Sequence, residues 1–404
     1  MRHRVDPRLR RAHLKRTRPR PPIATGAATL AFVVAAAAAF ALHWNRAQPA
    51  ELEMAPAAAH VANHPMHEAR DQHAAALLSD GRVLITGGVG YMHNKIPSSE
   101  IYKPSDGSWT ATASMAVPRS GHTSTLLADG TVLVAGGFSA TTGANAVELR
   151  SAERYMPTTN TWLPVPDMAG ARALHSATLL KDGRVLVVGI AVNSLTSTAA
   201  ELYEPKTNTW LLAASPRIPR IAHTATLLDD GRVLIVGGSG GGQPGYLTSA
   251  ELYDPAHNSW SPAASTLAPH SQQVVVKLKD GKVLVVGGEG ASQDAELYDP
   301  GRNLWSSAGT PLSGRRLHSG ALLGDGRAVV VSGDTSQGAT ATTELYDPSS
   351  NRWLSGPELA YARIISTATS LPDGTVLVAG GRQGHGHDYD NGSMLNSAEI
   401  VSGK

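Results

Sequence analysis

The side chains best suited to chemistry lie near the end of the chain, between residues 382 and 392. This glycine-rich segment contains His385, His387, Asp388 and Asp390, and imidazole nitrogens with carboxylate oxygens are ligands that suit zinc or a similar divalent ion. A solvated loop that binds metal only adventitiously explains the same residues, and we favour it because a metal site needs a converged geometry. We therefore expect no resident cofactor and keep these four residues as candidate metal ligands.

A second set of charged residues recurs at fixed spacing in seven repeats. The residue that opens each repeat is Arg70, Arg119, Arg172, Arg220, His270, Arg315 or Arg363. A glutamate follows in every repeat, at Glu100, Glu153, Glu201, Glu251, Glu296, Glu344 and Glu399. These residues could form a charged ring around a channel, but buried charges are retained when they are paired, and a repeated pair suits a repeated fold. We predict that the opening residues pair with the glutamates or with backbone carbonyls.

Histidines also recur, three residues after the opening position. They are His73, His122, His175, His223 and His318. A symmetric ring of imidazoles could bind a metal or an anion, but one copy per repeat is more typical of packing. We predict a structural role for these five histidines.

The repeat itself predicts the elements that position these residues. Each copy, clearest over residues 220–260, has a run such as His-Thr-Ala-Thr-Leu-Leu, an Asp-Gly pair, a wholly apolar run and an Ala-Glu-Leu-Tyr-Asp-Pro segment before a tryptophan. An Asp-Gly pair between two such runs predicts a β-hairpin, and the wholly apolar run predicts a strand that is covered on both faces. Four short antiparallel strands per repeat, arranged radially, make an all-β, seven-bladed propeller.

The ring is expected to close through the N-terminal side of the repeats. The seventh repeat has its first three strands, the third at residues 398–401, but only Ser402 to Lys404 follow them. Counting back from Arg70 places residues 57–63 in phase with the missing fourth strand. We predict that this segment completes the seventh blade.

The repeats resemble the kelch family, in the galactose-oxidase-like style with the signature His-Ser-x-x-Leu-Leu-x-Asp-Gly-x-Val-Leu-Val-x-Gly-Gly. The resemblance covers about residues 57–404. It implies a seven-bladed propeller but no single activity, because kelch propellers serve as binding scaffolds, oxidases and sugar epimerases. Galactose-oxidase-like enzymes hold copper with histidines and tyrosines, one tyrosine being cross-linked to a cysteine. This chain has no cysteine, and no tyrosine precedes its repeated histidines, so the resemblance does not extend to the copper-radical oxidase.

Function is expected where the repeats differ. All the length variation falls between the second and third strands, and these loops share one face of the propeller, at one mouth of the channel, with the opening residues. Loops carry function while the scaffold that holds them stays constant. The candidate binding residues at this rim are Tyr91, His93, Tyr246, Arg382 and Tyr389.

The charge of the chain is concentrated at its start. Residues 1–22 carry nine cations against Asp6, a formal +8, which leaves −6 for the remainder of a chain whose net charge is +2. The uncharged run from Ile23 to Leu42 spans about 30 Å as a helix, the thickness of a bilayer core. A basic flank before such a run predicts an N-terminal membrane anchor with its arginine-rich side cytoplasmic, or an export signal that is cleaved after Ala41.

These patterns divide the chain into a basic cytoplasmic tail at residues 1–22, a transmembrane anchor or signal segment at 23–44, a linker at 45–56 and the propeller at 57–404. We predict a monomeric propeller outside the cytoplasmic membrane, periplasmic or extracellular, or secreted if the signal is cleaved. It would recognise a protein or a glycan. The alternative is a kelch-type carbohydrate-active enzyme, such as a sugar epimerase or mutarotase. The −6 charge disfavours nucleic acid as a partner.

Overall fold

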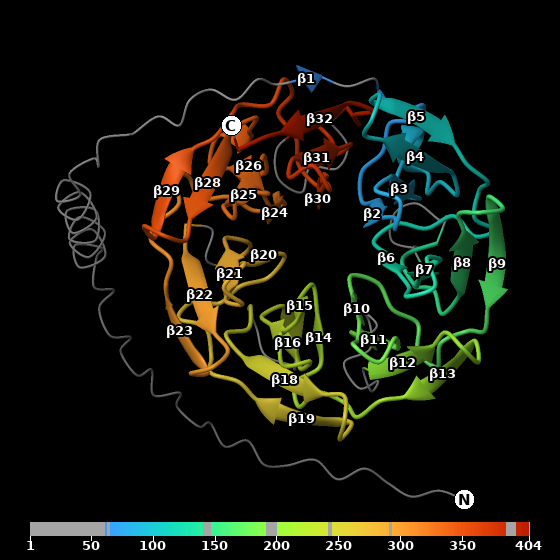
Figure 1. The fold of residues 1–404 in the computed structure, drawn as a ribbon, viewed down its shortest axis with the longest axis horizontal. Coiled ribbons are helices and arrows are strands. Elements are labelled where there is room, and N and C mark those ends of the chain that lie inside the picture. The colour runs from blue at the N-terminus through green and yellow to red at the C-terminus, as the bar shows by residue number, and fades with distance from the viewer. Residues whose placement is uncertain are drawn as a thin grey trace, which may run out of the picture. The chain divides into compact units, whose positions relative to one another are not determined.

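Seven four-stranded antiparallel sheets form a ring in the computed structural model (Figure 1). The structure describes residues 61–62, 65–139, 147–190, 200–240, 245–290, 293–384 and 393–403. The predicted tail, membrane segment and linker lie outside these residues. Between Val61 and Gly403, where the chain is described, there is no helix long and apolar enough to cross a membrane.

Each sheet is one blade, with strands a to d from the centre of the ring outward (Figure 1). The a strands are β2 (Ala74–Leu77), β6 (Thr123–Leu126), β10 (Ser176–Leu179), β15 (Thr224–Leu227), β20 (Val274–Lys277), β24 (Ser319–Leu322) and β30 (Thr367–Ser370). The b strands are β3 (Val83–Thr86), β7 (Val132–Ala135), β11 (Val185–Val188), β16 (Val233–Val236), β21 (Val283–Val286), β25 (Ala328–Val331) and β31 (Val376–Ala379).

The outer strands carry the Ala-Glu-Leu-Tyr and tryptophan segments. The c strands are β4 (Ser99–Lys103), β8 (Ala152–Met156), β12 (Ala200–Glu204), β18 (Ala250–Asp254), β22 (Ala295–Asp299), β28 (Thr343–Asp347) and β32 (Ala398–Val401). The d strands are β5 (Ser108–Ala111), β9 (Thr161–Val165), β13 (Thr209–Leu212), β19 (Ser259–Pro262), β23 (Leu304–Ser307), β29 (Arg352–Ser355) and β1 (Val61–Ala62).

The N-terminal strand closes the ring. β1 pairs with β32, matching Val61 with Ile400 and Ala62 with Glu399. The seventh blade therefore combines the two ends of the described chain, which confirms the closure predicted from the phase of the repeats.

The hydrophobic core lies between the blades. All four residues of every b strand are buried, and the buried apolar side chains form seven clusters, each shared by two neighbouring blades. We call the interface of two neighbouring blades a seam. Because each b strand is packed on both sides, its sequence has no polar face, as expected for a sheet sandwiched between two others.

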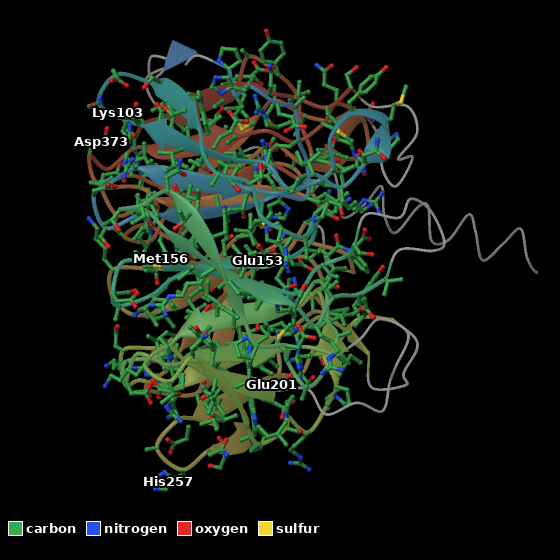
Figure 2. All side chains as sticks on the ribbon, turned by 90° about the vertical axis from the view of Figure 1, so that its right-hand side faces the viewer. Lys103, Glu153, Met156, Glu201, His257 and Asp373 are labelled. Atoms are coloured by element: carbon green, nitrogen blue, oxygen red, sulfur yellow. The ribbon has the colours of Figure 1, made fainter. Side chains whose placement is uncertain are left out.

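The ring has two different faces. The a–b and c–d turns lie at one face, which we call the turn face; Lys103, Met156, His257 and Asp373 all lie toward it in Figure 2. The opposite loop face carries the b–c loops and the connections from each blade to the next. Short additional elements occur near this face: the 3-10 turn η1 (Tyr91–His93), the pair β14 (Arg220–Ile221) and β17 (Ser239–Gly240), and the hairpin β26 (Asp334–Thr335) and β27 (Gly338–Ala339).

Candidate functional site

The opening arginines are buried structural residues. In the first blade Arg70 donates to the carbonyls of Gly87 and Ser98 at 2.9 and 3.0 Å and to Glu100 Oε1 at 2.8 Å. The Glu100 carboxylate also accepts the backbone N–H of His67 at 2.7 Å. The same arrangement joins Arg119 to Glu153, Arg172 to Glu201, Arg220 to Glu251, His270 to Glu296, Arg315 to Glu344 and Arg363 to Glu399. The predicted pairing is confirmed, and these charges tie each blade-to-blade connection to strand c.

The strand-a histidines link neighbouring blades. His73 Nε2 lies 2.9 Å from Thr367 Oγ1, and His122, His175 and His223 contact Thr86, Thr123 and Ser176 in the same way. Neither ring nitrogen of His318 contacts a hydroxyl group, and the preceding blade carries Val274 where blades seven, two and three carry Thr367, Thr123 and Ser176. Burial lowers the pKa of His73, His223 and His318 to about 3 and that of His122 and His175 well below the usual value. These neutral side chains are suited to packing.

Backbone hydrogen bonds join neighbouring blades beside these histidines at five of the seven seams. The residue before each histidine position has positive φ in all seven blades: Gln72, Gly121, Leu174, Ala222, Gln272, Leu317 and Ile365. The N–H of Gly121 donates to the carbonyl of Gln72 at 3.0 Å, and that of Leu174 to Gly121 at 3.1 Å. Left-handed conformation is costly for a β-branched residue such as Ile365, and the bond from its N–H to the carbonyl of Leu317, at 2.9 Å, helps to hold it in place.

The blades differ at two backbone-paired positions of the loop face, which we call the mouth belt. The first follows the opening residue: Asp71, Ser120, Ala173, Ile221, Ser271, Arg316 and Ile364. The second follows strand b: Val89, Phe138, Ser239, Glu289, Asp334 and Arg382. Antiparallel bridges join the two positions within a blade, for example Asp71 with Val89 and Ile364 with Arg382. The charged belt residues all belong to blades five, six, seven and one, whereas the described belt residues of blades two to four are uncharged.

The seam of blades seven and one holds a buried carboxylate. Asp71 is fully buried, and neither of its carboxylate oxygens has a hydrogen-bond partner. Arg382 Nε of blade seven lies 3.4 Å from Asp71 Oδ2. Burial raises the pKa of Asp71 to about 6, opposed by the charges of Arg382, His93 and Lys95. A carboxyl group in this state exchanges its proton near neutral pH, which ordinary aspartates do not.

The seam of blades five and six holds a second charged group, which is fully paired. Arg316 Nη1 contacts Glu289 Oε1 at 2.7 Å, and its Nε contacts Asp334 Oδ2 at 3.0 Å. The same belt position that carries a carboxylate facing one guanidinium in blade one thus carries a guanidinium between two acids in blade six.

The structure brings three of the predicted rim residues to one seam. Tyr91, which is 80% exposed, and His93 form η1 beside Asp71, and Arg382 faces Asp71 from blade seven. Tyr246 lies elsewhere, beside Gly290 at the seam of blades four and five. Sequence reasoning missed Asp71, Lys95, Glu289, Arg316 and Asp334. Aligning the repeats position by position would have shown Asp71 and Arg316 as the charged members of one column, and Glu289 and Asp334 with Arg382 as those of another. Lys95 lies in a loop that does not align.

Tyr389 and the candidate metal ligands His385, His387, Asp388 and Asp390 lie outside the described residues. Among the residues that are described, no three histidine, aspartate or glutamate side chains are grouped as a metal site would require.

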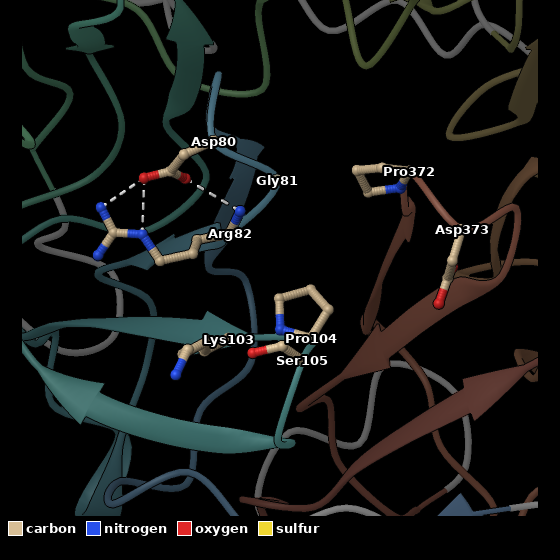
Figure 3. A pocket seen from close by; sticks show the side chains of 8 residues that line it. All are labelled: Asp80, Gly81, Arg82, Lys103, Pro104, Ser105, Pro372 and Asp373. Carbon is tan, nitrogen blue, oxygen red and sulfur yellow. Dashed lines mark hydrogen bonds and ion pairs between the residues drawn. The ribbon is translucent and has the colours of Figure 1, made fainter.

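The turn face has a cavity of about 460 Å³ at the same seam of blades seven and one. Pro104 and Pro372 line it, with the ion pair of Asp80 and Arg82, 2.7 Å apart, on one side (Figure 3). Similar hollows recur at the turn face of other seams, for example beside Asp182. Because this cavity repeats with the fold, it is a property of the blade, in contrast to the mouth belt.

Comparisons with known proteins agree with this architecture. The kelch motif matches residues 118–169 and 220–266. The chain is similar to the structure of a fungal alcohol oxidase of the AA5 family in complex with copper, with 18% identity, coverage of 87% of this chain and 76% of that chain, and a TM-score of 0.67. It is also similar to YjhT, with 14% identity, coverage of 84% and 97%, and a TM-score of 0.52. No curated protein sequence matches significantly. At these identities the likenesses show the fold alone.

The residues of this chain do not fit the copper site that a galactose-oxidase-like propeller implies. The chain has no cysteine to cross-link to a tyrosine. The residues before the five strand-a histidines are Gln72, Gly121, Leu174, Ala222 and Leu317, and four of these histidines are bonded to hydroxyl groups of neighbouring blades. The kelch motif matches two of the repeats, and all seven repeats form four-stranded blades, so the chain is a seven-bladed β-propeller that contains kelch motifs.

Proposed function

We propose that the protein is a recognition propeller that binds a glycan at the mouth of its loop face. The observation that carries this proposal is the uneven mouth belt, whose charged side chains all belong to blades five, six, seven and one, whereas the opening charges recur in every blade. Binding residues usually lie on the loops that vary between repeats, while the strands that hold these loops stay constant. Carboxylates and guanidinium groups bond well to hydroxyl groups, which both donate and accept.

A glycan suits this rim better than a protein does. Protein interfaces are built around broad apolar or aromatic surface, whereas the described rim offers small groups: Tyr91 with Met92, at 80% and 69% exposure, and Tyr246 at 43% on another seam. A single exposed aromatic ring beside charged groups presents an apolar face and polar partners of the kind that a sugar ring needs.

A glycan array probed with the full chain tests the proposal. Tyr91→Ala is expected to weaken binding of the selected glycan at least tenfold. Leu212→Ala is the matched control, because Leu212 is 71% exposed but lies on outer strand β13. An empty array, combined with capture of a protein that Tyr91→Ala no longer binds, would show that the ligand is a protein instead.

A carbohydrate-active enzyme, such as a sugar epimerase or mutarotase, is the second candidate. The observation that favours it is the pKa of Asp71, raised by burial to about 6, since a general acid or base works best with a pKa near the operating pH. Screening free sugars for anomer interconversion, with Asp71→Asn as the comparison, separates the two candidates: catalysis that Asp71→Asn abolishes identifies an enzyme.

We also propose that the propeller is exported and held outside the cytoplasmic membrane by residues 23–44. The support is the uncharged apolar run from Ile23 to Leu42, which follows a tail of formal charge +8. Membrane fractionation with N-terminal sequencing of the mature protein distinguishes an anchor, which keeps residue 1, from a signal cleaved after Ala41.

A further inference from the structure

Blade one carries two polar side chains that its scaffold does not require. In every blade the strand-c glutamate accepts backbone N–H groups from the connection that leads into that blade, and Glu100 accepts those of His67 and Glu68 at 2.7 and 3.2 Å. This contact needs no particular side chain. The corresponding pairs in the other blades are Ala116 and Val117, Ala169 and Gly170, Arg217 and Ile218, Leu267 and Ala268, Leu312 and Ser313, and Ala360 and Tyr361.

The imidazole of His67 is held from behind by the scaffold. Its Nδ1 lies 2.8 Å from Glu100 Oε2, and Arg70 Nη2 donates to the other oxygen of that carboxylate at 2.8 Å. Because an ionised carboxylate only accepts hydrogen bonds, Nδ1 must be the donor, and the neutral ring keeps an unprotonated Nε2. Glu100 is 1% exposed whereas His67 is 60% exposed, so the free end of the ring is an oriented acceptor that a ligand can reach.

The carboxylate of Glu68 is held in a similar way. Its Oε2 accepts a hydrogen bond from Ser98 Oγ and lies 3.7 Å from Arg70 Nη2, while the side chain as a whole is 41% exposed. Its Oε1 has no hydrogen-bond donor within the described ranges of the chain. A Cβ on Gly90 would come within 3.4 Å of this oxygen, and Gly90 directly precedes Tyr91. The second acceptor therefore lies beside the start of η1.

These two acceptors select a ligand that donates hydrogen bonds. Sugar hydroxyl groups are such donors, and the exposed ring of Tyr91 next to Gly90 offers the apolar face that a sugar ring needs. A zinc ion would require at least three protein ligands, and no third histidine or carboxylate joins the pair among the residues that the structure describes. An anion would be repelled by the ionised Glu68.

We propose that Glu68 and His67 form the polar half of the glycan site, where Glu68 Oε1 and His67 Nε2 accept hydrogen bonds from two hydroxyl groups of a sugar whose ring stacks on Tyr91. This inference rests on the proposed glycan-binding function and specifies the ligand as an uncharged sugar, because the carboxylate of a uronate would lie beside that of Glu68. Glu100 is a positioning residue, which orients the imidazole without touching the ligand.

Titration calorimetry with the full chain compares neutral sugars with their acidic counterparts. The probes are methyl glucoside, methyl galactoside and methyl mannoside, and the three uronides in which a carboxylate replaces the CH₂OH group. At least one neutral glycoside should bind about tenfold more tightly than its uronide, because like charges oppose each other at Glu68. Glu68→Gln should remove this preference, since glutamine keeps an acceptor oxygen without the charge. Glu358→Gln is the matched control, because Glu358 is exposed on the connection from blade six to blade seven.

A substitution of His67 tests the second acceptor. His67→Ala should weaken binding of the neutral glycoside about tenfold, because one sugar hydroxyl then loses its partner. The variant should fold, since Ala116, Ala169 and Ala360 occupy the equivalent position in blades two, three and seven. An unchanged affinity in this variant would exclude His67 from the site.

Deoxy sugars test the hydroxyl contacts on the native chain, without any variant. Replacing one hydroxyl group of the bound glycoside by hydrogen leaves an acceptor without its donor, so two of the monodeoxy analogues should each lose about tenfold in affinity. Equal affinities across the whole monodeoxy series would overturn the proposal.

Tyr91→Ala separates failure of this inference from failure of the proposed function. If Tyr91→Ala weakens binding of a glycoside while Glu68→Gln and His67→Ala leave its affinity and its preference over the uronide unchanged, the glycan function stands and this subsite is overturned. Absence of binding by these sugars and on the glycan array contradicts both. Zinc binding that His67→Ala abolishes, without any sugar binding, would show that the two side chains are metal ligands instead.

Discussion

Two serines replace a repeated histidine and glycine at the seam of blades six and seven. Elsewhere the glycine after strand b lies against the next blade's histidine: a Cβ on Gly136 would come within 2.7 Å of His175 Cε1, and one on Gly380 within 2.7 Å of His73 Cε1. Blade seven has Ser366 in place of the histidine, and blade six has Ser332 in place of the glycine, with the two hydroxyl oxygens 3.4 Å apart. Ser366 is smaller than the histidine that it replaces, and the space this leaves accommodates Ser332, which is larger than the glycine that it replaces.

This compensation predicts strong coupling between the two positions. Ser366→His alone should clash with Ser332 and lower the free energy of unfolding by about 1–3 kcal/mol. Adding Ser332→Gly should recover most of that loss, because the pair then matches the other seams. Denaturant unfolding of the native chain, both single variants and the double variant measures the coupling. Additive effects would show that the two serines do not share this space.

At the residue scale, the sequence predicts uniform features better than exceptions. The pairing of Arg70 with Glu100 follows from repetition, because a charge that recurs in every blade needs a recurring partner. Asp71 carried no such signal: it is a single residue whose importance depends on being buried beside Arg382, and burial of one side chain at a seam cannot be derived from spacing alone.

At the scale of elements, the seventh blade depends on a strand of two residues. β1 contributes two residue pairs to β32, and the backbone beyond it continues the contact, with Met66 N donating to Asn396 O at 2.7 Å. Deleting residues 55–65 should expose the edge of β32 and lower the melting temperature by about 5 °C or more. Deleting residues 45–52 is the control. Equal melting temperatures for both deletions and the native chain, measured by circular dichroism, would contradict a closing role.

The strands were predictable because the sequence shows both the period of the repeat and its turns. An Asp-Gly pair lies in the turn after every a strand, and the apolar run that follows this turn is the b strand. The short pairs β14–β17 and β26–β27 were not predicted. They are formed by loop segments such as Ser239–Gly240 and Gly338–Ala339, which have no alternating pattern and are positioned by the blades that flank them.

At the scale of the whole molecule, the five strand-a histidines make stability depend on pH. Their pKa lies at about 3 or well below the usual value in the folded chain and near 6.5 when the chain is unfolded. The unfolded chain therefore binds more protons, and the free energy of unfolding falls as pH falls below about 6.5. Asp71 acts in the opposite direction, because its raised pKa stabilises the fold only at low pH and that contribution is lost as pH rises through about 6.

The expected slope is about 1.4 kcal/mol per pH unit for each histidine that stays neutral in the folded chain. His223→Gln should reduce the slope by the contribution of one histidine. It should not disrupt packing, since Gln273 of blade five fills the equivalent position and donates to Thr224 Oγ1 at 3.0 Å. Free energies of unfolding measured between pH 4 and 6 give the number of protons taken up. A slope that His223→Gln leaves unchanged would mean that this histidine already titrates in the folded chain.

The direction of β1 has a mechanical consequence. β32 runs from the loop face to the turn face, and β1 is antiparallel to it, so the chain that leads into Val61 joins the ring at the turn face. A force applied at Val61 acts along β1 and shears the Val61–Ile400 and Ala62–Glu399 pairs together, so this outer strand pair of blade seven is the first to carry a load.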